Sequence, residues 1–353
     1  MATTNTSSLK PSQLVLDPQK RIPLLKDHHH HHHDGHELTL PIGKSHTRPG
    51  DSQGGENGSV YFIGTATTVI EWQGIRILTD PNFLHAGDHV HLGPGVTAER
   101  LTNPAVNLDQ LPPLDCILLS HYHADHFDQL VEASLNRQFP IISTPHAKQA
   151  LTSKDDPFQA VYDLDFFETL LLPIAPGPLT DTFKPSPTIK VTGMPGKHVP
   201  PGPLSAINDF LHAVPPTNGW LIELGHAAGA PADMQTGYRI YISGDTLVVD
   251  ELKAIPTWLQ YHKVDLMLVH LGGTTVPGPG MPLLMITMDG KQGVQLMRLV
   301  DPDVTVPIHF DDYSVFLSPL ADFKAEVEGA GFGERVVYLD RGDEYRFRVR
   351  GGE

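Results

Sequence analysis

The chain has 353 residues, with 41 Asp and Glu against 25 Lys and Arg, so its formal net charge is −16. Because nucleic-acid affinity comes mostly from Lys and Arg that neutralise phosphates, this charge and the lack of a basic run in the sequence argue against a nucleic-acid binder. A hydrophobic content of 40% is enough for a substantial core, which excludes a disordered acidic tail.

The N-terminal part, residues 1–58, is polar, interrupted by prolines, and contains the run His28 to His33. This composition predicts a partly flexible extension, followed by one domain over 59–353. The first residues lack the apolar stretch of a signal peptide, and no segment approaches the ~20 apolar residues of a membrane span. A single cysteine, Cys116, excludes an intrachain disulfide. We therefore expect a cytosolic protein.

From residue 59 onward the sequence predicts short strands with helices between them. Two or three strands of a meander are expected within 59–79, and residues 81–113, rich in Pro and Gly, are expected to form a rim or lid. The next elements are a buried strand over 115–120, a helix over 127–137, a short strand over 140–143 and a helix near 146–152. Their order is β-α-β-α.

The second half of the chain continues this pattern. Strands are expected at 188–193, 219–224, 238–243, 264–269 and 304–308, and helices at 249–261, at 290–300 with Asp289 as N-cap, and at 318–330. Apolar residues alternate on both sides of Arg341-Gly342-Asp343, which predicts a terminal hairpin of 335–340 with 344–350. The sequence thus predicts an α/β fold with a two-sheet core flanked by helices.

Six residues directly after the strand at 115–120 carry the strongest chemical signal: His121-Tyr122-His123-Ala124-Asp125-His126. Side chains two residues apart in an extended segment project to the same side, and the two after the turn can converge nearby. Imidazole and carboxylate groups are ligands that Zn²⁺ prefers, and a catalytic site leaves one position open for water. Packing alone has no use for this density of ligand groups, so the motif predicts a metal site.

The motif resembles the HxHxDH signature of the metallo-β-lactamase superfamily, and the resemblance covers roughly residues 59–350. It extends to Asp80, His198, Asp245 and His309, each of which follows an apolar strand. The resemblance implies an αββα sandwich of two mixed sheets, with the metals held by loops at one sheet edge.

Carried over to this sequence, the resemblance implies seven metal ligands. One metal would be held by His121, His123 and His198, and a second by Asp125, His126 and His309, with Asp245 bridging the two. Asp80 would support the loop through hydrogen bonds. Two Zn²⁺ per chain are expected, and Mn²⁺ or Fe²⁺ are alternatives because these ions tolerate the same ligands.

Three further roles are expected at this site. Asp125 is a ligand that can also orient or shuttle a proton. His270, after the strand at 264–269, is a candidate proton donor or substrate contact, with a structural histidine as the alternative. Tyr122 is a candidate oxyanion donor, with simple packing as the alternative.

The predicted reaction is the attack of a metal-bridging hydroxide on an electrophilic carbonyl. Within the superfamily the chain resembles the branch with ascorbate-phosphate lactonase and N-acylphosphatidylethanolamine phospholipase D, in Gly74 to Pro81, Leu271-Gly272-Gly273, Thr287-Met288-Asp289 and Pro307-Ile308-His309. It departs at Gly64-Thr65-Ala66-Thr67, where that branch often has Gly-His-Ala-Ser/Thr. A lactone or lactam is the first substrate class that this resemblance implies.

Two other functions stay open. A phosphodiesterase or phospholipase D-like hydrolase would use the same two metals, and a catalytically silent relative would bind a metal or ligand without turnover. For the enzyme, the expected partner is a small-molecule substrate and no nucleic acid. A homo-oligomer is compatible with the sequence.

Overall fold

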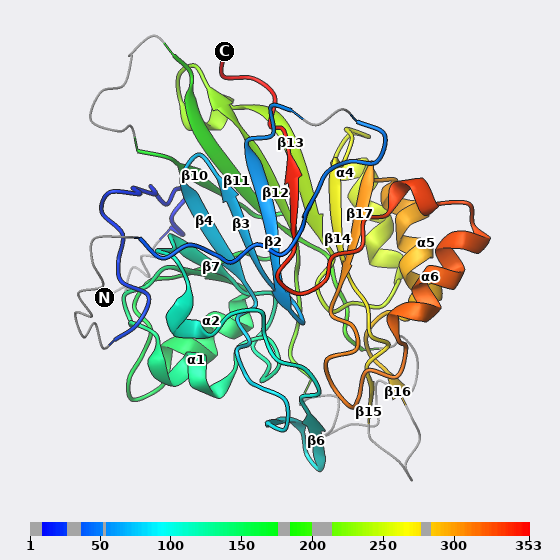
Figure 1. Ribbon diagram of the computed structural model, residues 1–353. Coiled ribbons are helices and arrows are strands. Elements are labelled where there is room, and N and C mark those ends of the chain that lie inside the picture. Colours follow the sequence, from blue (N-terminus) through cyan, green and yellow to red (C-terminus); the bar gives the residue numbers. More distant parts are fainter. Residues whose placement is uncertain (1–8, 27–36, 52–53, 176–183, 200–213, 277–283) are drawn as a thin grey trace, which may run out of the picture.

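The computed structural model consists of two β-sheets that face each other, with helices on the outer side of each (Figure 1). It describes residues 9–26, 37–51, 54–175, 184–199, 214–276 and 284–353. The run His28 to His33 lies outside these residues. No helix within the described ranges is long and apolar enough to cross a membrane. The expected αββα sandwich of two mixed sheets is confirmed.

The first sheet has eight strands in the order β1-β18-β2-β3-β4-β7-β8-β9. Their bounds are β1 Ser45–His46, β2 Gly58–Gly64, β3 Thr67–Trp72, β4 Ile75–Thr79, β7 Cys116–Leu118, β8 Ile141–Ser143, β9 Val161–Asp163 and β18 Glu344–Phe347. β2, β3 and β4 form the predicted antiparallel meander, and β4, β7, β8 and β9 are parallel.

The second sheet has six strands in the order β10-β11-β12-β13-β14-β17. Their bounds are β10 Thr169–Pro173, β11 Ser186–Met194, β12 Gly219–Ala227, β13 Gln235–Ile242, β14 Leu266–His270 and β17 Val304–Ile308. The sheet is antiparallel from β10 to β13 and parallel from β13 through β14 to β17. As a result, β11, β13, β14 and β17 all point their carboxyl ends to the same edge of the sandwich.

The helices are short. Their bounds are α1 Gln129–Ser134, α2 Pro145–Thr152, α4 Ala254–Trp258, α5 Gly290–Val300 and α6 Leu320–Gly329, with 3-10 turns η1 Leu108–Gln110, η3 Pro231–Asp233, η4 Asp250–Lys253 and η5 Gly333–Arg335. α5 has the predicted bounds because Asp289 caps its first turn by accepting from the Gln292 N–H. The predicted helix at 249–261 is shorter, since the backbone turns left-handed at Gln260 and Tyr261.

The predicted terminal hairpin is wrong. β18 pairs with β2 and β1 of the eight-stranded sheet, whereas Val336 bridges to Thr305 of β17 in the six-stranded sheet. Alternating apolar residues identify both segments as extended, but they cannot show that the chain crosses from one sheet to the other between them.

Three hydrophobic clusters hold these layers together. The main core lies between the sheets, where Trp72, Trp220 and Tyr241 are among the largest buried side chains. A second core packs α1 and α2 on the outer face of the eight-stranded sheet. A third and smaller one joins the hairpin of β5 (His89–Gly93) and β6 (Val96–Glu99) to residues near β15 (Thr275–Val276) and β16 (Leu284–Met285). The predicted rim at 81–113 therefore contains a hairpin.

Part of the N-terminal extension lies against the sandwich. The backbone N–H groups of Leu14 and Leu16 donate to the carbonyls of Leu171 and Pro173 on β10, at 2.8 and 2.9 Å. Leu16 is buried in the main core. Residues 12–16 thus run along β10, the edge strand of the six-stranded sheet, whereas Leu25 bridges to Leu135 directly after α1 (Figure 1).

Candidate metal centre

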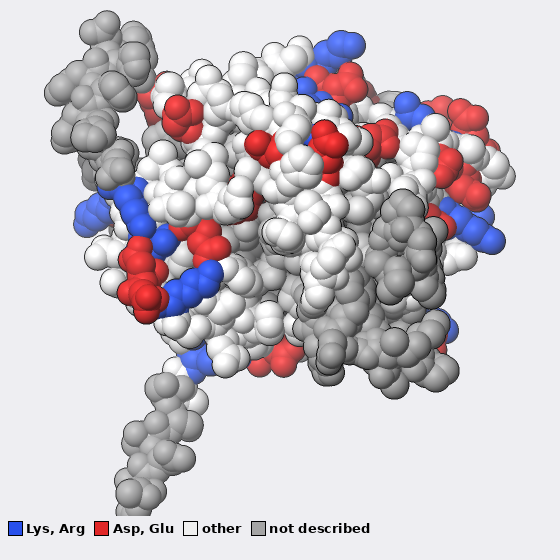
Figure 2. Space-filling model, turned by 90° about the horizontal axis from the view of Figure 1, so that it is seen from below, with Lys and Arg blue, Asp and Glu red and all other residues white. Residues whose placement is uncertain are grey.

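The seven predicted ligands all lie just beyond the carboxyl ends of strands. His121, His123, Asp125 and His126 follow β7, His198 follows β11, Asp245 follows β13, and His309 follows β17. Seen from the end on which β6, β15 and β16 lie, the described surface is mostly uncharged, with most charged side chains toward its margins (Figure 2). The parallel strands bring residues from four distant parts of the sequence to one place.

These side chains form two adjoining groups. The first is His121, His123 and His198, and the second is Asp125, His126, Asp245 and His309; within each, one ligand atom per residue lies within 4.8 Å of the others. Asp245 connects the groups: its Oδ2 lies 2.9 Å from His126 Nε2, 3.4 Å from His309 Nε2 and 3.8 Å from His198 Nε2. One carboxylate oxygen thus faces histidines of both groups.

The donor atoms of these groups fit metal ions. Four of them are buried without a hydrogen-bond partner: His121 Nε2, His123 Nδ1, Asp125 Oδ1 and His309 Nε2. A buried polar atom without a partner costs roughly 1–3 kcal/mol, so four converging ones would be costly unless something else satisfied them. Nitrogen and carboxylate donors in this number suit one or two divalent transition metals.

The second nitrogen of each histidine is held by the protein. His123 Nε2 bonds to the Leu92 carbonyl (2.9 Å), His198 Nδ1 to the Ile286 carbonyl (2.5 Å), His309 Nδ1 to the Leu271 carbonyl (2.9 Å), His126 Nδ1 to Asp80 (2.7 Å) and His121 Nδ1 to Ser120 Oγ (2.9 Å). Such bonds fix the ring orientation and leave the other nitrogen as a lone pair directed at the site.

Asp80 supports the loop that carries the motif. Its Oδ1 accepts the Ser120 N–H at 2.7 Å, and its Oδ2 accepts the Ser120 hydroxyl at 2.5 Å and His126 Nδ1 at 2.7 Å. Asp80 and His309 both have left-handed backbones, with φ of +35° and +61°. For residues other than glycine this costs roughly 1–3 kcal/mol each, and such strain is concentrated at functional sites.

Burial and neighbouring charges set the protonation of the cluster. Burial lowers the pKa of His198 to about 4 and holds the pKa of His121 well below its ordinary value. Burial also opposes the charge of His126, but Asp245 and other carboxylates raise its pKa well above the ordinary value. For Asp245 burial is opposed by the histidines, which hold its pKa well below the usual range. Neutral imidazoles and ionised carboxylates are the forms that bind metals, so His121, His198 and Asp245 are in the binding form, whereas His126 has to give up a proton when a metal binds.

The structure places His270 behind the cluster. It ends β14, is 1% exposed, and its Nδ1 lies 2.8 Å from Asp245 Oδ1. Its ring is nearly parallel to those of His126 and His309, at centroid distances of 5.9 and 5.4 Å. His270 thus occupies Oδ1 of Asp245, while Oδ2 faces histidines of both groups.

Tyr122 is not brought to the cluster. Its hydroxyl lies 2.8 Å from Glu132 Oε2 and also contacts Lys154 Nζ. Its ring packs beside Phe127 in the second core.

Several residues that support the site were missed by sequence reasoning. Ser120 and Asn82 were not singled out, although Asn82 Nδ2 donates to the Asp125 carbonyl at 2.8 Å. Ser120 directly precedes the motif, and that position was its only signal. Nothing in the sequence identifies the carbonyls of Leu92, Leu271 and Ile286 as acceptors for these histidines, because every residue has a carbonyl.

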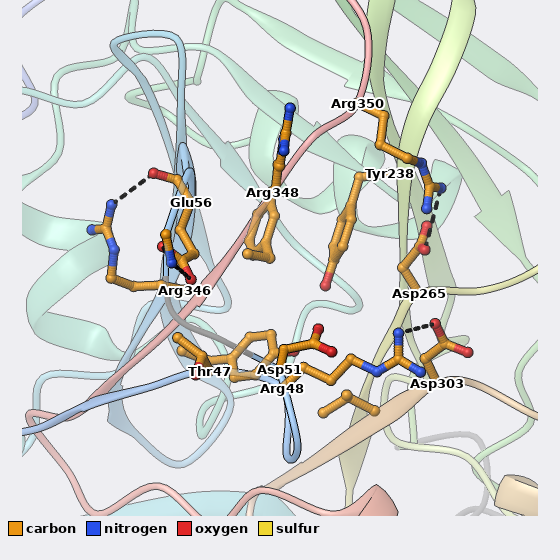
Figure 3. A pocket seen from close by; sticks show the side chains of 14 residues that line it. Thr47, Arg48, Asp51, Glu56, Tyr238, Asp265, Asp303, Arg346, Arg348 and Arg350 are labelled. Carbon is orange, nitrogen blue, oxygen red and sulfur yellow. Dashed lines mark hydrogen bonds and ion pairs between the residues drawn. The ribbon is translucent and has the colours of Figure 1, made fainter.

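A pocket of about 390 Å³ lies at the other end of the sandwich, where β14 and β17 begin (Figure 3). Its lining includes Arg48 paired with Asp303 at 3.5 Å and Arg350 paired with Asp265 at 3.4 Å. The metal-binding groups do not contribute to its lining. Its charges are largely matched within the chain, which sets it apart from the histidine cluster.

Comparisons with known proteins agree with this geometry. The model of the "Beta-lactamase superfamily domain" family matches residues 75–310. A UPF0173 metal-dependent hydrolase of Polaromonas sp. is 32% identical over 293 residues, which are 82% of this chain and 89% of that protein. One of Archaeoglobus fulgidus is 27% identical over 233 residues, 66% of this chain and 82% of that protein.

A solved structure with a similar fold is that of an isothiocyanate hydrolase from Delia radicum gut bacteria, with a TM-score of 0.61 and 17% identity, covering 82% of this chain and all (100%) of that one. At this identity the likeness concerns the fold alone. The family match, the relatives and the buried His and Asp cluster lead to one conclusion: the chain belongs to the beta-lactamase superfamily, among the UPF0173 metal-dependent hydrolases, and uses a metal ion cofactor.

Proposed function

We propose that the chain is a dinuclear metallo-hydrolase that opens the ring of a lactone or lactam. The observation that carries this proposal is the position of Asp245 Oδ2, which lies within 3.8 Å of ligand nitrogens in both groups. A carboxylate oxygen between two sets of donors is what a pair of adjacent metals requires.

We propose that the residues divide between two ions as the resemblance implies. His121, His123 and His198 would hold one ion, Asp125, His126 and His309 the other, and Asp245 would contact both. When bound, two divalent ions supply an activated water as nucleophile and positive charge for the oxygen anion that develops. Zn²⁺ is the proposed metal, and Mn²⁺ and Fe²⁺ accept the same donors.

The remaining steps belong to side chains of the protein. His270 keeps Asp245 in place through the 2.8 Å contact with Oδ1. Asp125, whose Oδ1 is buried and without a hydrogen-bond partner, is proposed to orient the attacking water and to carry its proton to the leaving group. The low exposure of the cluster keeps the surroundings dry, which strengthens the electrostatic stabilisation of the transition state.

A neutral ring is favoured over a phosphodiester. Among the described residues, the hydrogen bonds and ion pairs of the seven ligands involve no Lys or Arg. Phosphate groups are commonly recognised by Arg and Lys. The lactone class is proposed because the sequence resembles the branch with ascorbate-phosphate lactonase. The proposed partner is a small molecule and not a nucleic acid.

The first test is the metal content of chain purified without a nickel column and with residues 28–33 deleted, so that the histidine run cannot bind metal. Two Zn or Mn per chain are expected. The metal-loaded protein is then assayed with a panel of lactones, lactams and a chromogenic bis-phosphodiester. Ring opening of a lactone or lactam is expected to be faster than cleavage of the phosphodiester.

Other results would point elsewhere. Faster cleavage of the phosphodiester would replace the proposal by a phosphodiesterase or phospholipase D-like activity. A single Fe per chain would move the search to oxygen-dependent chemistry. A chain that binds no metal would be a silent relative.

A further inference from the structure

The β5–β6 hairpin has a hydrophobic core of its own. Val90 and Leu92 point inward and are each 4% exposed, whereas His89 and His91 between them point outward. The inward side chains pack with Val96 and Ala98 of β6 and with residues from other parts of the chain: Leu84, Val276, Ile286, Tyr313, Val315 and Phe316. We call these ten residues the hairpin core. It is separate from the main core between the sheets.

Two residues of the hairpin core hold ligand histidines through their backbones. The Leu92 carbonyl accepts from His123 Nε2 at 2.9 Å, and the Ile286 carbonyl accepts from His198 Nδ1 at 2.5 Å. Both histidines belong to the first ligand group. The orientation of two of its three ligands therefore depends on where the hairpin core places these carbonyls.

The second ligand group is supported differently. His126 donates to Asp80, which follows β4, and His309 donates to the carbonyl of Leu271, which follows β14 and belongs to the main core. These acceptors are fixed by the sheets themselves. The hydrogen-bond acceptors of the two groups thus lie in different parts of the structure, and the hairpin core reaches the second group through the ring of Phe316, which packs on that of His309 at a centroid distance of 4.4 Å.

Backbone hydrogen bonds join the pieces of the hairpin core into one unit. The Ser314 N–H donates to the Glu99 carbonyl at 3.0 Å, the Thr275 N–H to the Val315 carbonyl at 3.1 Å, and the Ile286 N–H to the Thr274 carbonyl at 2.8 Å. A shift of the hairpin would therefore be passed along residues 313–316 to the segment that carries Ile286, and both carbonyls would move together.

We propose that the hairpin core is the positioning device of the first metal site. Loosening its packing weakens the hold on the ion between His121, His123 and His198 and leaves the ion of the second group in place. This inference rests on the proposed dinuclear function. Leu92 and Ile286 act through the ligand histidines, so they are positioning residues.

The test compares two truncations of equal size. Leu92→Ala removes a buried side chain from the hairpin core, and Leu151→Ala removes the same atoms from α2 in the second core, where Leu151 is 0% exposed. The metal-loaded full-length proteins are incubated with increasing chelator, passed over a desalting column and analysed for metal per chain. Supporting residues of ligands typically contribute 10–100-fold to metal affinity.

We expect Leu92→Ala to lose one of its two ions at a chelator concentration about 10-fold lower than the wild type, and the other at the wild-type concentration. Leu151→Ala should release both ions as the wild type does. The proposal is overturned if Leu92→Ala releases its ions like the wild type, if both ions weaken equally, or if Leu151→Ala shows the same selective loss.

A second pair of variants, with smaller truncations, provides the same test if Leu92→Ala does not fold. Val96→Ala in the hairpin core and Val161→Ala in the second core both remove two methyl groups, and the same selective loss is expected for Val96→Ala alone. The wild-type metal count separates the two proposals. A wild type with fewer than two ions overturns the dinuclear function, and unchanged release from the hairpin variants beside a two-ion wild type overturns only the positioning role.

Discussion

The two ends of the sandwich differ in whether their buried polar and charged groups have partners. At the carboxyl ends of the parallel strands, four buried donor atoms of histidine and aspartate have no hydrogen-bond partner. At the other end, arginines and aspartates around the 390 Å³ pocket are paired with one another. The difference shows that the pocket does not indicate where the functional site lies. Other buried polar atoms also have no partner, but only in this cluster do unpaired imidazole and carboxylate atoms of the described residues converge, which marks the place that requires a ligand.

Two aspartates make the same contrast on neighbouring strands. Asp245 follows β13 and Asp265 precedes β14, and they are 1% and 5% exposed. Asp245 faces four histidines, whereas Asp265 accepts the Arg239 N–H at 2.8 Å and pairs with Arg350. An equally buried carboxylate is therefore a proposed metal ligand at one end and a structural acceptor at the other.

The largest effect is expected from Asp245→Asn. The neutral amide lacks the charge of the carboxylate and is a much weaker bridge between two cations, so the variant should hold at most one metal, and hydrolysis should fall by at least ~10³-fold, which corresponds to the several kcal/mol that a metal pair contributes. Elemental analysis and turnover of the best panel substrate measure this. Asp265→Asn is the matched control and should keep both properties. Equal activity in the two variants would show that the two aspartates do not differ in function.

Asp80→Asn should have the next largest effect. It weakens the acceptor of His126 Nδ1 and of two Ser120 donors, so metal affinity should fall about 10–100-fold without loss of the fold. Competition with a coloured chelator measures the affinity, and circular dichroism checks the fold. Ser120→Ala, which removes only the hydroxyl, should fall between Asp80→Asn and the wild type. A metal affinity unchanged by Asp80→Asn would show that Asp80 does not support the site.

At the far end, Asp265→Ala should lower stability and leave the metals in place. The buried N–H of Arg239 loses its acceptor, and such losses cost about 1–3 kcal/mol. Urea unfolding gives the change in free energy, and elemental analysis gives the metal content. A chain that loses metal on this substitution would show that the two ends are coupled.

The smallest effect is expected from Arg350→Ala. Its side chain is 61% exposed, and exposed ion pairs contribute at most about 1 kcal/mol. The urea midpoint should therefore shift little, and metal content and turnover should match the wild type. A loss of turnover after this substitution would mean that the pocket in Figure 3 takes part in function.

Sequence reasoning works best where a local signal fixes a local structure. The Asp289 cap and the Gly290–Val300 helix follow from adjacent residues, and so does the meander of β2, β3 and β4. It fails where partners are distant. The segment at 335–340 has the alternation of a strand, but which sheet it joins is decided by contacts with β17 that no neighbouring residue records.

The same distinction holds at the site. The side chains of the two groups could be named from the sequence because the HxHxDH motif and its resemblance to the superfamily single them out, and the structure brings them together. The role of His270 could not be decided there, because it depends on a 2.8 Å contact with Asp245 from the neighbouring strand. The Leu92 and Ile286 carbonyls are invisible in a sequence, since their function comes from backbone position and not from side-chain type.

The N-terminal segment along β10 has a consequence for handling the protein. β10 (Thr169–Pro173) is an edge strand, and Leu14 and Leu16 cover its free backbone groups. A chain shortened beyond Ser12 to remove the histidine run would leave this apolar edge open to pairing with another copy, the usual route to aggregation of sheet proteins. Deletions in this part of the chain should therefore spare residues 12–16, or the product will precipitate for reasons unrelated to its chemistry.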